Sequence, residues 1–416
     1  MTTWLPETTT NFPATHRDNI LIDACGPPME PAEIGKRLIY LPPRPNATAH
    51  SSDFSLEHQA ADVFRMHIPT AAGIELAQTI GFMLTQGYIH RNPSDPSTWG
   101  RIYSAIGAQA AASPIQLGAM VTGISGAGKS TAIERALQLY PQVVTHERMA
   151  GLANPSPQLL WLKVDVPESG RIIDLVDNLV RATDEALGTS HAKDLLSGRR
   201  YAGSALAREW RQRISCNFLG LLVLDEIQNL FKIETKAKRE VVAKDRSGRR
   251  PELRIVDDEA LKFLLTLSNS SKIPTLYCST PDGMTALNTR MSTAQRMLSG
   301  GFHTFTHAES ADEDFFRKRL FPTLCQYQWL PEKLAASDEL RRLLFDLSAG
   351  VPRLAVMAWF HASRRAIQRK ASGLSFDDFR HVREHALGPL RPAVAALLSN
   401  DPRQLQRYED LLSATH

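Results

Sequence analysis

Residues 123–130, with the sequence GISGAGKS, have the types and the spacing of a phosphate-binding loop. They fit the pattern G-x-x-x-x-G-K-[ST] at every position. The glycines permit the positive φ angles and the close backbone approach that a nest of amides around a phosphate requires. An apolar stretch precedes the loop and a helical pattern follows it, so the helix N-terminus would also face the anion. The segment therefore predicts a nucleotide phosphate site.

The end of this loop indicates ATP with Mg²⁺ as the ligand. Lys129 is expected to reach the β and γ phosphates, Ser130 to ligate Mg²⁺, and Thr131 to lie near the α phosphate. The residues expected to bind the nucleotide are Gly123, Ser125, Gly126, Ala127, Gly128, Lys129, Ser130 and Thr131. The alternative is a glycine-rich turn without a ligand, which the strand–loop–helix context disfavours.

Two adjacent carboxylates, Asp225 and Glu226, directly follow the continuous apolar run Leu219–Leu224. Such a run is typical of a parallel strand buried on both faces, and carboxylates at its end are costly unless a cation or a reaction needs them. We expect Asp225 to hold Mg²⁺ and Glu226 to orient and polarise the attacking water. The alternative is that the pair starts a helix, where acidic residues suit the dipole.

Two further segments carry polar groups that a nucleotide site could use. The apolar run Ile273–Cys278 ends in Ser279 and Thr280, and the Thr280 hydroxyl is expected to contact the γ phosphate or the water. A strand-end turn before Pro281 is the alternative. Gly350–Arg353 opens a helix, and Arg353 suits phosphate because its guanidinium binds oxygens bidentately. An exposed arginine at a helix start is the alternative there.

The segments that carry these residues belong to a longer pattern, in which short apolar runs alternate with helical segments from about residue 115 onwards. This pattern predicts an α/β fold with a parallel sheet. The expected strands are 118–122, 159–166, 219–224, 273–279 and 302–306, and a helix is expected over 130–140. A helix is also predicted for 71–88. After about residue 311 no further strand is expected, and the predicted helices include 315–324, 338–348, 353–370 and 376–386. The expected domains are a partly irregular arm (1–60), a helical extension (61–114), the nucleotide-binding core (115–310), a helical lid (311–386) and a tail (387–416).

Composition sets the broad class of the protein. The 416 residues are 43% hydrophobic and 22% charged, as in ordinary globular proteins. The four cysteines, Cys25, Cys216, Cys278 and Cys325, form no metal-binding pair, which favours a reducing compartment. We see no signal-peptide pattern and no apolar run long enough for a membrane span, so we expect a cytoplasmic protein.

The net charge of +4 is too small to indicate nucleic acid, so any such argument depends on local clusters. Residues 232–254 contain nine Lys and Arg against four Asp and Glu, directly after the carboxylate pair. This segment could follow a phosphate backbone, or it could be a solvated insertion. Arg364, Arg365, Arg369 and Lys370 lie along one predicted helix, where a solvated face is the simpler interpretation. His303 and His307 would be about 13 Å apart in a strand, too far apart to share a metal.

Taken together, these motifs resemble the AAA+ ATPases of the TnsC/TniB family, which regulate target choice in heteromeric DNA transposons. The likeness covers roughly residues 60–412. The stretches that carry it are GISGAGKST (123–131), LLVLDEIQNL (221–230), STPDG (279–283), STAQRMLSG (292–300), GVPR (350–353), MLTQGYIHRNP (83–93) and YEDLL (408–412).

The resemblance implies an AAA+ core with a helical lid, in which Thr280 and Arg353 are the two nucleotide sensors. It also implies an arginine from a neighbouring subunit that completes the site, with Arg290 and Arg296 as candidates and Arg296 preferred. AAA+ proteins often carry Asn at the position of the first sensor, so Thr280 departs from that pattern.

For function, the resemblance implies ATP-dependent rings or helical filaments of the protein on duplex DNA. The partners would be a target selector of the TniQ/TnsD type and a TnsB-like DDE transposase. ATP hydrolysis would disassemble the oligomer, and the protein itself would not cut DNA. Three other classes remain open: a replication-initiator or clamp-loader-like ATPase, a STAND-type switch without a DNA role, and a small-molecule kinase. The short tail argues against the replication-initiator or clamp-loader class, and the absence of repeat sensors argues against the STAND-type switch. The segments DEIQNL and GVPR argue against the kinase, which would not need them.

Overall fold

The computed structural model describes residues 16, 18–45, 52–103, 117–191, 203–232, 254–255, 263, 267, 273–281, 283, 295–405 and 408. The chain forms two compact units, each assembled from three segments. Unit 1 comprises Met1–Pro31, Glu75–Thr122 and Ile133–His303, and unit 2 comprises Ala32–Ile74, Gly123–Ala132 and Thr304–His416. The domain limits expected from the sequence stay predictions.

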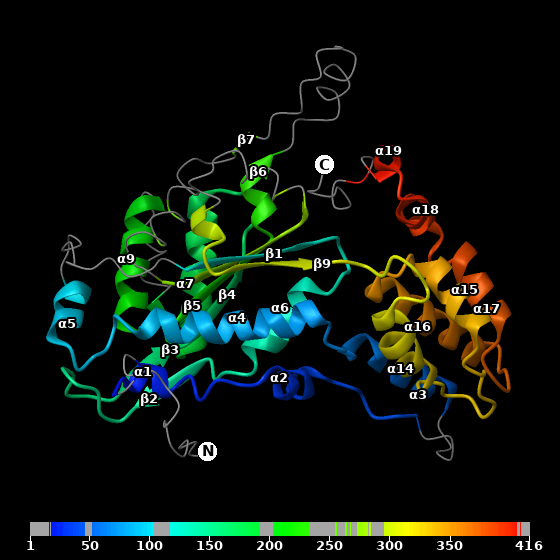
Figure 1. Cartoon of the computed structure of the whole chain (residues 1–416), viewed down its shortest axis with the longest axis horizontal. Helices are drawn as coiled ribbons and strands as arrows, with labels where there is room; N and C mark the ends of the chain where they lie inside the picture. Colours follow the sequence, from blue (N-terminus) through cyan, green and yellow to red (C-terminus); the bar gives the residue numbers. More distant parts are fainter. Residues whose placement is uncertain are drawn as a thin grey trace, which may run out of the picture. The chain divides into compact units, whose positions relative to one another are not determined.

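The α/β fold with a helical C-terminal region is confirmed. Five strands form the main sheet in the order β4-β5-β8-β1-β9 (Figure 1). They are β1 (Gly118–Gly123), β4 (Trp161–Asp165), β5 (Leu221–Asp225), β8 (Thr275–Ser279) and β9 (Gly301–Phe305). The pairs β4–β5, β5–β8 and β8–β1 are parallel. The three central strands β1, β5 and β8 are buried along their whole length, as their continuous apolar runs predict.

The stretch expected to be one strand at 159–166 forms two strands in different sheets. β3 (Ser156–Leu159) pairs antiparallel with β2 (Val143–His146), and β4 then joins the main sheet. The chain changes sheets at Leu160, whose backbone N–H donates to Gln142 O at 2.8 Å. Both halves are apolar, so periodicity alone could not reveal the break.

The helices of unit 1 pack on this sheet. α4 (Ala71–Tyr88) has the predicted bounds, α6 (Lys129–Leu137) follows β1, and α5 (Pro96–Tyr103) is short. α7 (Ile172–Leu187) and α9 (Gly203–Cys216) share a core with one face of the sheet, to which Leu162, Leu222 and Tyr277 contribute. A minor sheet pairs β6 (Phe231–Lys232) with β7 (Arg254–Ile255).

Part of the N-terminal segment, which the sequence suggested to be loosely structured, is helical. It contains α1 (Ile20–Asp23), α2 (Pro31–Leu38) and α3 (Asp53–Ala61), followed by a 3-10 turn at Asp62–Arg65. Asn19 caps α1 and also donates to Tyr88 O at 2.9 Å, while Gln158 donates to Leu21 O at 2.9 Å. These buried contacts join residues far apart in the chain, which is why a local pattern did not reveal them.

Unit 2 is helical from residue 306 to residue 405, and no strand is described in that range. Its helices are α14 (Phe321–Cys325), α15 (Asp338–Ser348), α16 (Pro352–Gln368), α17 (Phe376–Glu384), α18 (Arg391–Ser399) and α19 (Pro402–Leu405), with a 3-10 turn at Gly388–Leu390. The helix predicted at 315–324 begins as a π-helical segment, Phe316–Leu320. Pro322 lacks the N–H for a regular α-helical bond, which accounts for the irregularity before it.

The core of unit 2 is built around Trp359, Phe379 and Phe316, all fully buried. Within the described ranges, no single helix is long and apolar enough to cross a membrane. Among the helices that the structure describes, one pair, α15 and α16, satisfies that test together by length and composition, with a bend of 114° between the two.

Candidate nucleotide-binding site

The loop between β1 and α6 has the backbone that a phosphate nest needs. At Gly123 φ is +152°, and a Cβ atom there would lie 2.1 Å from the Phe305 carbonyl oxygen, so only glycine fits. Gly126 and Gly128 have φ of +81° and +96°. A Cβ atom on Gly128 would meet no atom within 4 Å, which shows that the space beside this glycine is open. α6 begins at Lys129, so its first amides face the loop.

Lys129 turns back over its own loop. Its Nζ atom donates to the carbonyl oxygens of Gly123 at 2.5 Å and Ile124 at 3.1 Å. Ser130 and Thr131 follow in the first helical turn. A lysine ammonium at the start of a helix suits a polyphosphate, because the ammonium and the first backbone N–H groups of the helix are all donors.

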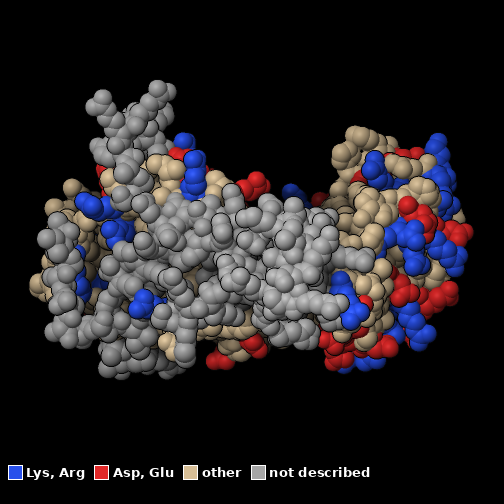
Figure 2. All heavy atoms as spheres, turned by 90° about the horizontal axis from the view of Figure 1, so that it is seen from above, with Lys and Arg blue, Asp and Glu red and all other residues tan. Residues whose placement is uncertain are grey.

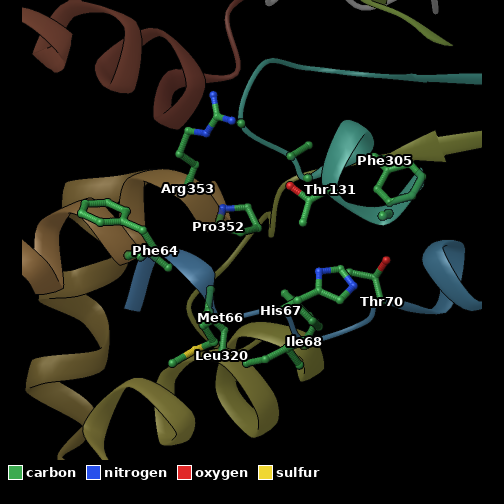
Figure 3. Close-up of a pocket in the computed structure, with 16 residues that line it drawn as sticks. Phe64, Met66, His67, Ile68, Thr70, Thr131, Phe305, Leu320, Pro352 and Arg353 are labelled. Atoms are coloured by element: carbon green, nitrogen blue, oxygen red, sulfur yellow. The ribbon is translucent and has the colours of Figure 1, made fainter. Parts of the chain in front are cut away.

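Unit 2 brings Arg353 to this loop. Val351 precedes α16, Pro352 occupies its first turn, and the Arg353 backbone N–H donates to Gly126 O at 3.3 Å. Figure 3 shows the Arg353 side chain extending from α16 toward the chain that leads into α6. Arg353 therefore lies beside the phosphate loop in unit 2, and the expectation that it binds the nucleotide stays a prediction.

A pocket beside the loop is lined by Gly126, Gly128 and Thr131 and by apolar side chains from other segments (Figure 3). The apolar residues are Phe64, Met66, Ile68, Phe305, Phe315, Leu320, Pro352 and Val356. The sequence analysis missed this wall, because its members come from three separate segments without a motif. A polar nest next to an apolar wall suits a ligand with a phosphate chain and a flat, weakly polar base.

Asp225 lies at the end of β5 with its side chain 5% exposed. Its Oδ2 atom is 3.5 Å from Lys163 Nζ, which also lies 3.1 Å from Glu134 and 3.4 Å from Asp165. Burial by itself disfavours the Lys163 ammonium, but the charge of Asp225, with Glu134 and Asp165, outweighs it and holds the pKa of Lys163 above its ordinary value. The sequence analysis did not identify Lys163. The feature that could have indicated it is the presence of a lysine within the apolar strand WLKVD.

Glu226 follows in the left-handed region, with φ of +57°, which is uncommon for a residue other than glycine. Its backbone N–H donates to Asp225 Oδ1 at 3.0 Å, and its side chain is exposed. The conformation directs the two adjacent carboxylates differently, so that one is buried and the other reaches solvent. Such local strain is characteristic of functional sites.

The end of β8 contacts the loop after β5 through Gln228. Gln228 Oε1 accepts from Thr280 N at 3.3 Å and from Ser279 Oγ at 3.4 Å, and Gln228 Nε2 donates to Glu226 Oε2. Thr280 thus takes part through its backbone, and the predicted contact of its hydroxyl with phosphate stays a prediction. Gln228 is a second residue that the sequence analysis missed.

The strand order places the ends of the central strands side by side. β8 lies between β1 and β5, Thr122 is paired in register with Ser279, and Leu224 is paired in register with Tyr277. Because these strands are parallel, β1, β8 and β5 all end at the same edge of the sheet. Open α/β sheets generally bind ligands at the carboxyl ends of their strands.

Several other predicted residues lie apart from this edge or outside the described residues. Arg296 is exposed, and its carbonyl oxygen accepts from Ser299 Oγ at 3.1 Å. Arg290 and residues 233–253 of the basic segment lie outside the described residues. His303 in β9 contacts Thr79 Oγ1 at 3.0 Å. The described residues contain no group of three or more His, Cys, Asp or Glu side chains that could hold a metal ion.

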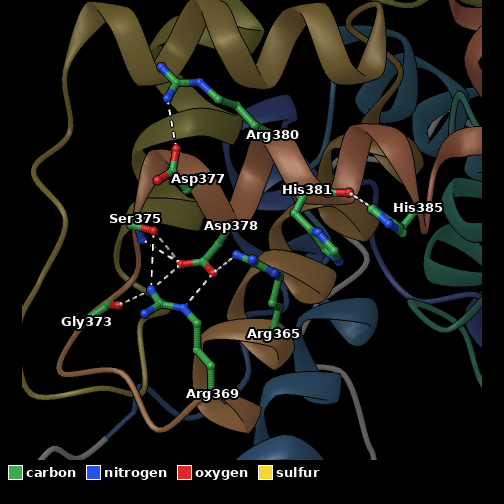
Figure 4. A network of polar contacts seen from close by, with 9 residues as sticks. All are labelled: Arg365, Arg369, Gly373, Ser375, Asp377, Asp378, Arg380, His381 and His385. Carbon is green, nitrogen blue, oxygen red and sulfur yellow. Dashed lines mark hydrogen bonds and ion pairs between the residues drawn. The ribbon is translucent and has the colours of Figure 1, made fainter.

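Three of the four basic residues at the end of α16 and just after it form ion pairs. Arg364 contacts Glu57 at 2.8 Å, and Arg365 and Arg369 both contact Asp378, at 2.7 and 2.8 Å (Figure 4). Positive and negative side chains are also interspersed on the face of the helices α15–α17 that Figure 2 shows at the right. A mixed surface of this kind lacks the single-sign field that attracts a phosphate backbone.

Residues 116–287 match the family model described as an AAA domain. The chain carries an AAA-type ATPase domain. None of the curated protein sequences compared with it matches.

Solved structures similar to the chain include the Aeropyrum pernix ORC2 protein in ADPNP-ADP complexes, at 14% identity and a TM-score of 0.40, over 66% of this chain and 63% of that one. This chain therefore spans less than two thirds of that relative. The structure of Drosophila ORC bound to DNA is similar at 13% identity and a TM-score of 0.41, over 88% of this chain and 72% of that one.

Proposed function

We propose that this protein binds ATP and Mg²⁺ at its AAA domain and uses hydrolysis as a switch that controls its assembly on duplex DNA during transposition. The observation that carries the nucleotide part lies in unit 2, where the phosphate loop and Arg353 line one pocket. Lys129 and Arg353 supply the positive charge that a triphosphate needs, and the apolar wall suits the base.

The residues expected at the metal fit Mg²⁺. The Ser130 hydroxyl and the Asp225 carboxylate offer the hard oxygen ligands that Mg²⁺ prefers, with substrate phosphates completing the shell. Bound there, the ion would neutralise charge on the β and γ phosphates. Glu226 orients the attacking water, Thr280 contacts the γ phosphate or that water, and Arg296 of a neighbouring subunit stabilises the transition state.

The role in transposition is supported by the TnsC/TniB-like stretches, above all DEIQNL at 225–230 and GVPR at 350–353. In this proposal ATP favours a homo-oligomeric ring or helical filament on duplex DNA. The oligomer links a TniQ/TnsD-like target selector to a TnsB-like transposase in the cytoplasm. Hydrolysis releases the DNA, and strand cleavage belongs to the transposase.

Electron microscopy with duplex DNA tests this function, with a non-hydrolysable ATP analogue compared against ADP. We expect rings or filaments on DNA with the analogue and their loss with ADP. Lys129→Ala should abolish assembly, while Glu226→Gln should bind ATP and retain DNA-bound assemblies. Monomers in every condition would instead favour a kinase or a STAND-type switch.

A strand-transfer assay with the transposase of the same genetic element separates transposition from replication initiation. We expect the ATP-bound protein to direct insertion to the DNA that it covers. Filaments that leave transposase activity and target choice unchanged would contradict the transposition role and favour the replication-initiator class.

A further inference from the structure

The side-chain amide of Gln228 joins Glu226 to the end of β8. Its oxygen faces β8, where it accepts from the Thr280 backbone N–H at 3.3 Å and lies 3.4 Å from Ser279 Oγ. Its nitrogen donates to Glu226 Oε2. One side chain therefore contacts both polar loops that leave the central strands of unit 1.

The chemistry of the partners fixes the orientation of this amide. The Thr280 N–H can only donate, so the Gln228 oxygen must face it, and the ionised Glu226 carboxylate can only accept, so the nitrogen must face that group. Reversing the amide would oppose donor to donor and acceptor to acceptor. A glutamine satisfies both contacts at once, whereas a glutamate at 228 would set a negative charge against Glu226.

The surrounding backbone holds Gln228 in place. It lies on the 3-10 turn Ile227–Leu230, whose first and last side chains are buried. In the same turn, Asn229 Nδ2 donates to Val166 O at 2.8 Å. Gly283 packs so closely that a Cβ atom there would lie 2.2 Å from Ser279 Oγ and 2.8 Å from Gln228 Cβ. A half-buried side chain supported in this way can hold a neighbouring group in one position.

We propose that Gln228 is a positioning residue for ATP hydrolysis. By holding Oε2 of Glu226, it leaves Oε1 of that exposed carboxylate to accept a hydrogen bond from the attacking water. It also ties Glu226 to Ser279 and Thr280, so that a shift of this strand end is passed to Glu226. Gln228 itself exchanges no proton. This inference rests on the proposed role of Glu226 in ATP hydrolysis.

The test is steady-state ATP hydrolysis by the full chain with duplex DNA present, comparing the parent with Gln228→Ala and Gln228→Glu. We expect kcat to fall by about 10- to 100-fold in both variants, because a misplaced catalytic group costs rates of this order. KM for ATP should stay within about twofold, because the side-chain amide of Gln228 bonds Glu226, Ser279 and Thr280, and none of these is expected to carry the main part of ATP binding.

Two comparisons separate positioning from a structural effect. Asn229→Ala removes the side-chain hydrogen bond to Val166 but keeps the backbone N–H that donates to Glu226 O, so it should lower the melting temperature while kcat stays within about threefold. In a Glu226→Gln background, adding Gln228→Ala should lower the residual kcat no further, because residues that act as one unit are not additive.

The outcomes identify which proposal fails. A parent that hydrolyses ATP beside a Gln228→Ala variant with unchanged kcat would overturn the positioning role alone. The positioning role would also be overturned if Asn229→Ala lowered kcat as much as Gln228→Ala does. It would be overturned too if Gln228→Ala lowered the residual kcat of Glu226→Gln by the same factor as it lowers kcat in the parent. A parent that shows no hydrolysis with DNA would overturn the proposed function and, with it, the role of Gln228.

Discussion

The ammonium of Lys163 lies 3.5 Å from Oδ2 of Asp225, the carboxylate expected to hold Mg²⁺. The two side chains are 17% and 5% exposed, so solvent screens the pair only weakly. Lys163 also contacts Glu134 on α6 and Asp165 on β4. A fixed positive charge thus compensates Asp225 within the protein itself, which lets a carboxylate stay buried before any metal arrives.

Lys163→Met should therefore lower stability and raise Mg²⁺ affinity together. Losing the counter-charge leaves Asp225 buried and unpaired, and we expect the unfolding free energy to fall by roughly 2 kcal/mol. Because a cation near the metal is removed, the Mg²⁺ concentration for half-maximal ATP hydrolysis should fall by about threefold or more. Denaturant unfolding and Mg²⁺ titration measure the two effects.

The control for Lys163 is Arg181→Met on α7, which breaks an exposed ion pair with Asp177 at 3.0 Å. It should change neither quantity appreciably, since exposed pairs contribute little. An unchanged Mg²⁺ requirement in the Lys163 variant would place the metal away from Asp225.

Arg353→Ala should weaken nucleotide binding. The arginine begins α16 beside the phosphate loop, and a lost charge-assisted contact to phosphate corresponds to about a 10- to 100-fold rise in Kd. Calorimetry with a non-hydrolysable ATP analogue measures it. Arg364→Ala, on the same helix but paired with Glu57, is the control and should bind as the parent does. Equal affinities for all three proteins would remove Arg353 from the site.

Two glycine variants separate steric conflict from backbone strain in the phosphate loop. Gly123→Ala places a methyl group 2.1 Å from the Phe305 carbonyl oxygen, so β1 and β9 must move apart. Gly128→Ala meets no atom within 4 Å but must hold φ at +96°, a strain of about 1–2 kcal/mol. Thermal unfolding should therefore show the larger loss for Gly123→Ala, and both variants should bind ATP poorly. A more stable Gly123→Ala protein would contradict the packing described at Phe305.

Local patterns identified the parts of this protein whose structure is local. Helices α4 and α15 have their predicted bounds because each is a long segment with apolar residues at helical spacing. All residues of the phosphate loop could be identified from the sequence, since its function depends on one contiguous backbone. Lys163 and Gln228 could not be identified in this way, because most of their partners lie elsewhere in the chain. Gln228 and Ser279, for example, are 51 residues apart. No local pattern distinguishes Gln228 from the other polar residues, and the one local signal for Lys163 was its place within the apolar strand WLKVD.

A final prediction concerns Asp378, which anchors the helices α16 and α17 (Figure 4). Its side chain is fully buried, and its oxygens accept from Arg365 at 2.7 Å, Arg369 at 2.8 Å and Ser375 Oγ at 2.7 Å. Burial by itself would raise the pKa of Asp378, but these hydrogen bonds outweigh it and hold the pKa below its ordinary value.

A carboxylate whose pKa is lower in the folded than in the unfolded state contributes stability above its unfolded pKa and loses it as the pH falls through the folded one. The free energy of unfolding of unit 2 in the parent should therefore fall below about pH 4. In Asp378→Asn, the free energy of unfolding at pH 7 should be about 2 kcal/mol lower than in the parent, and it should fall less on acidification. Denaturant unfolding at several pH values measures this. Asp377→Asn, which breaks only the exposed pair with Arg380, should keep the parent profile. If both variants responded to pH alike, Asp378 would not be the group that makes the helices acid-sensitive.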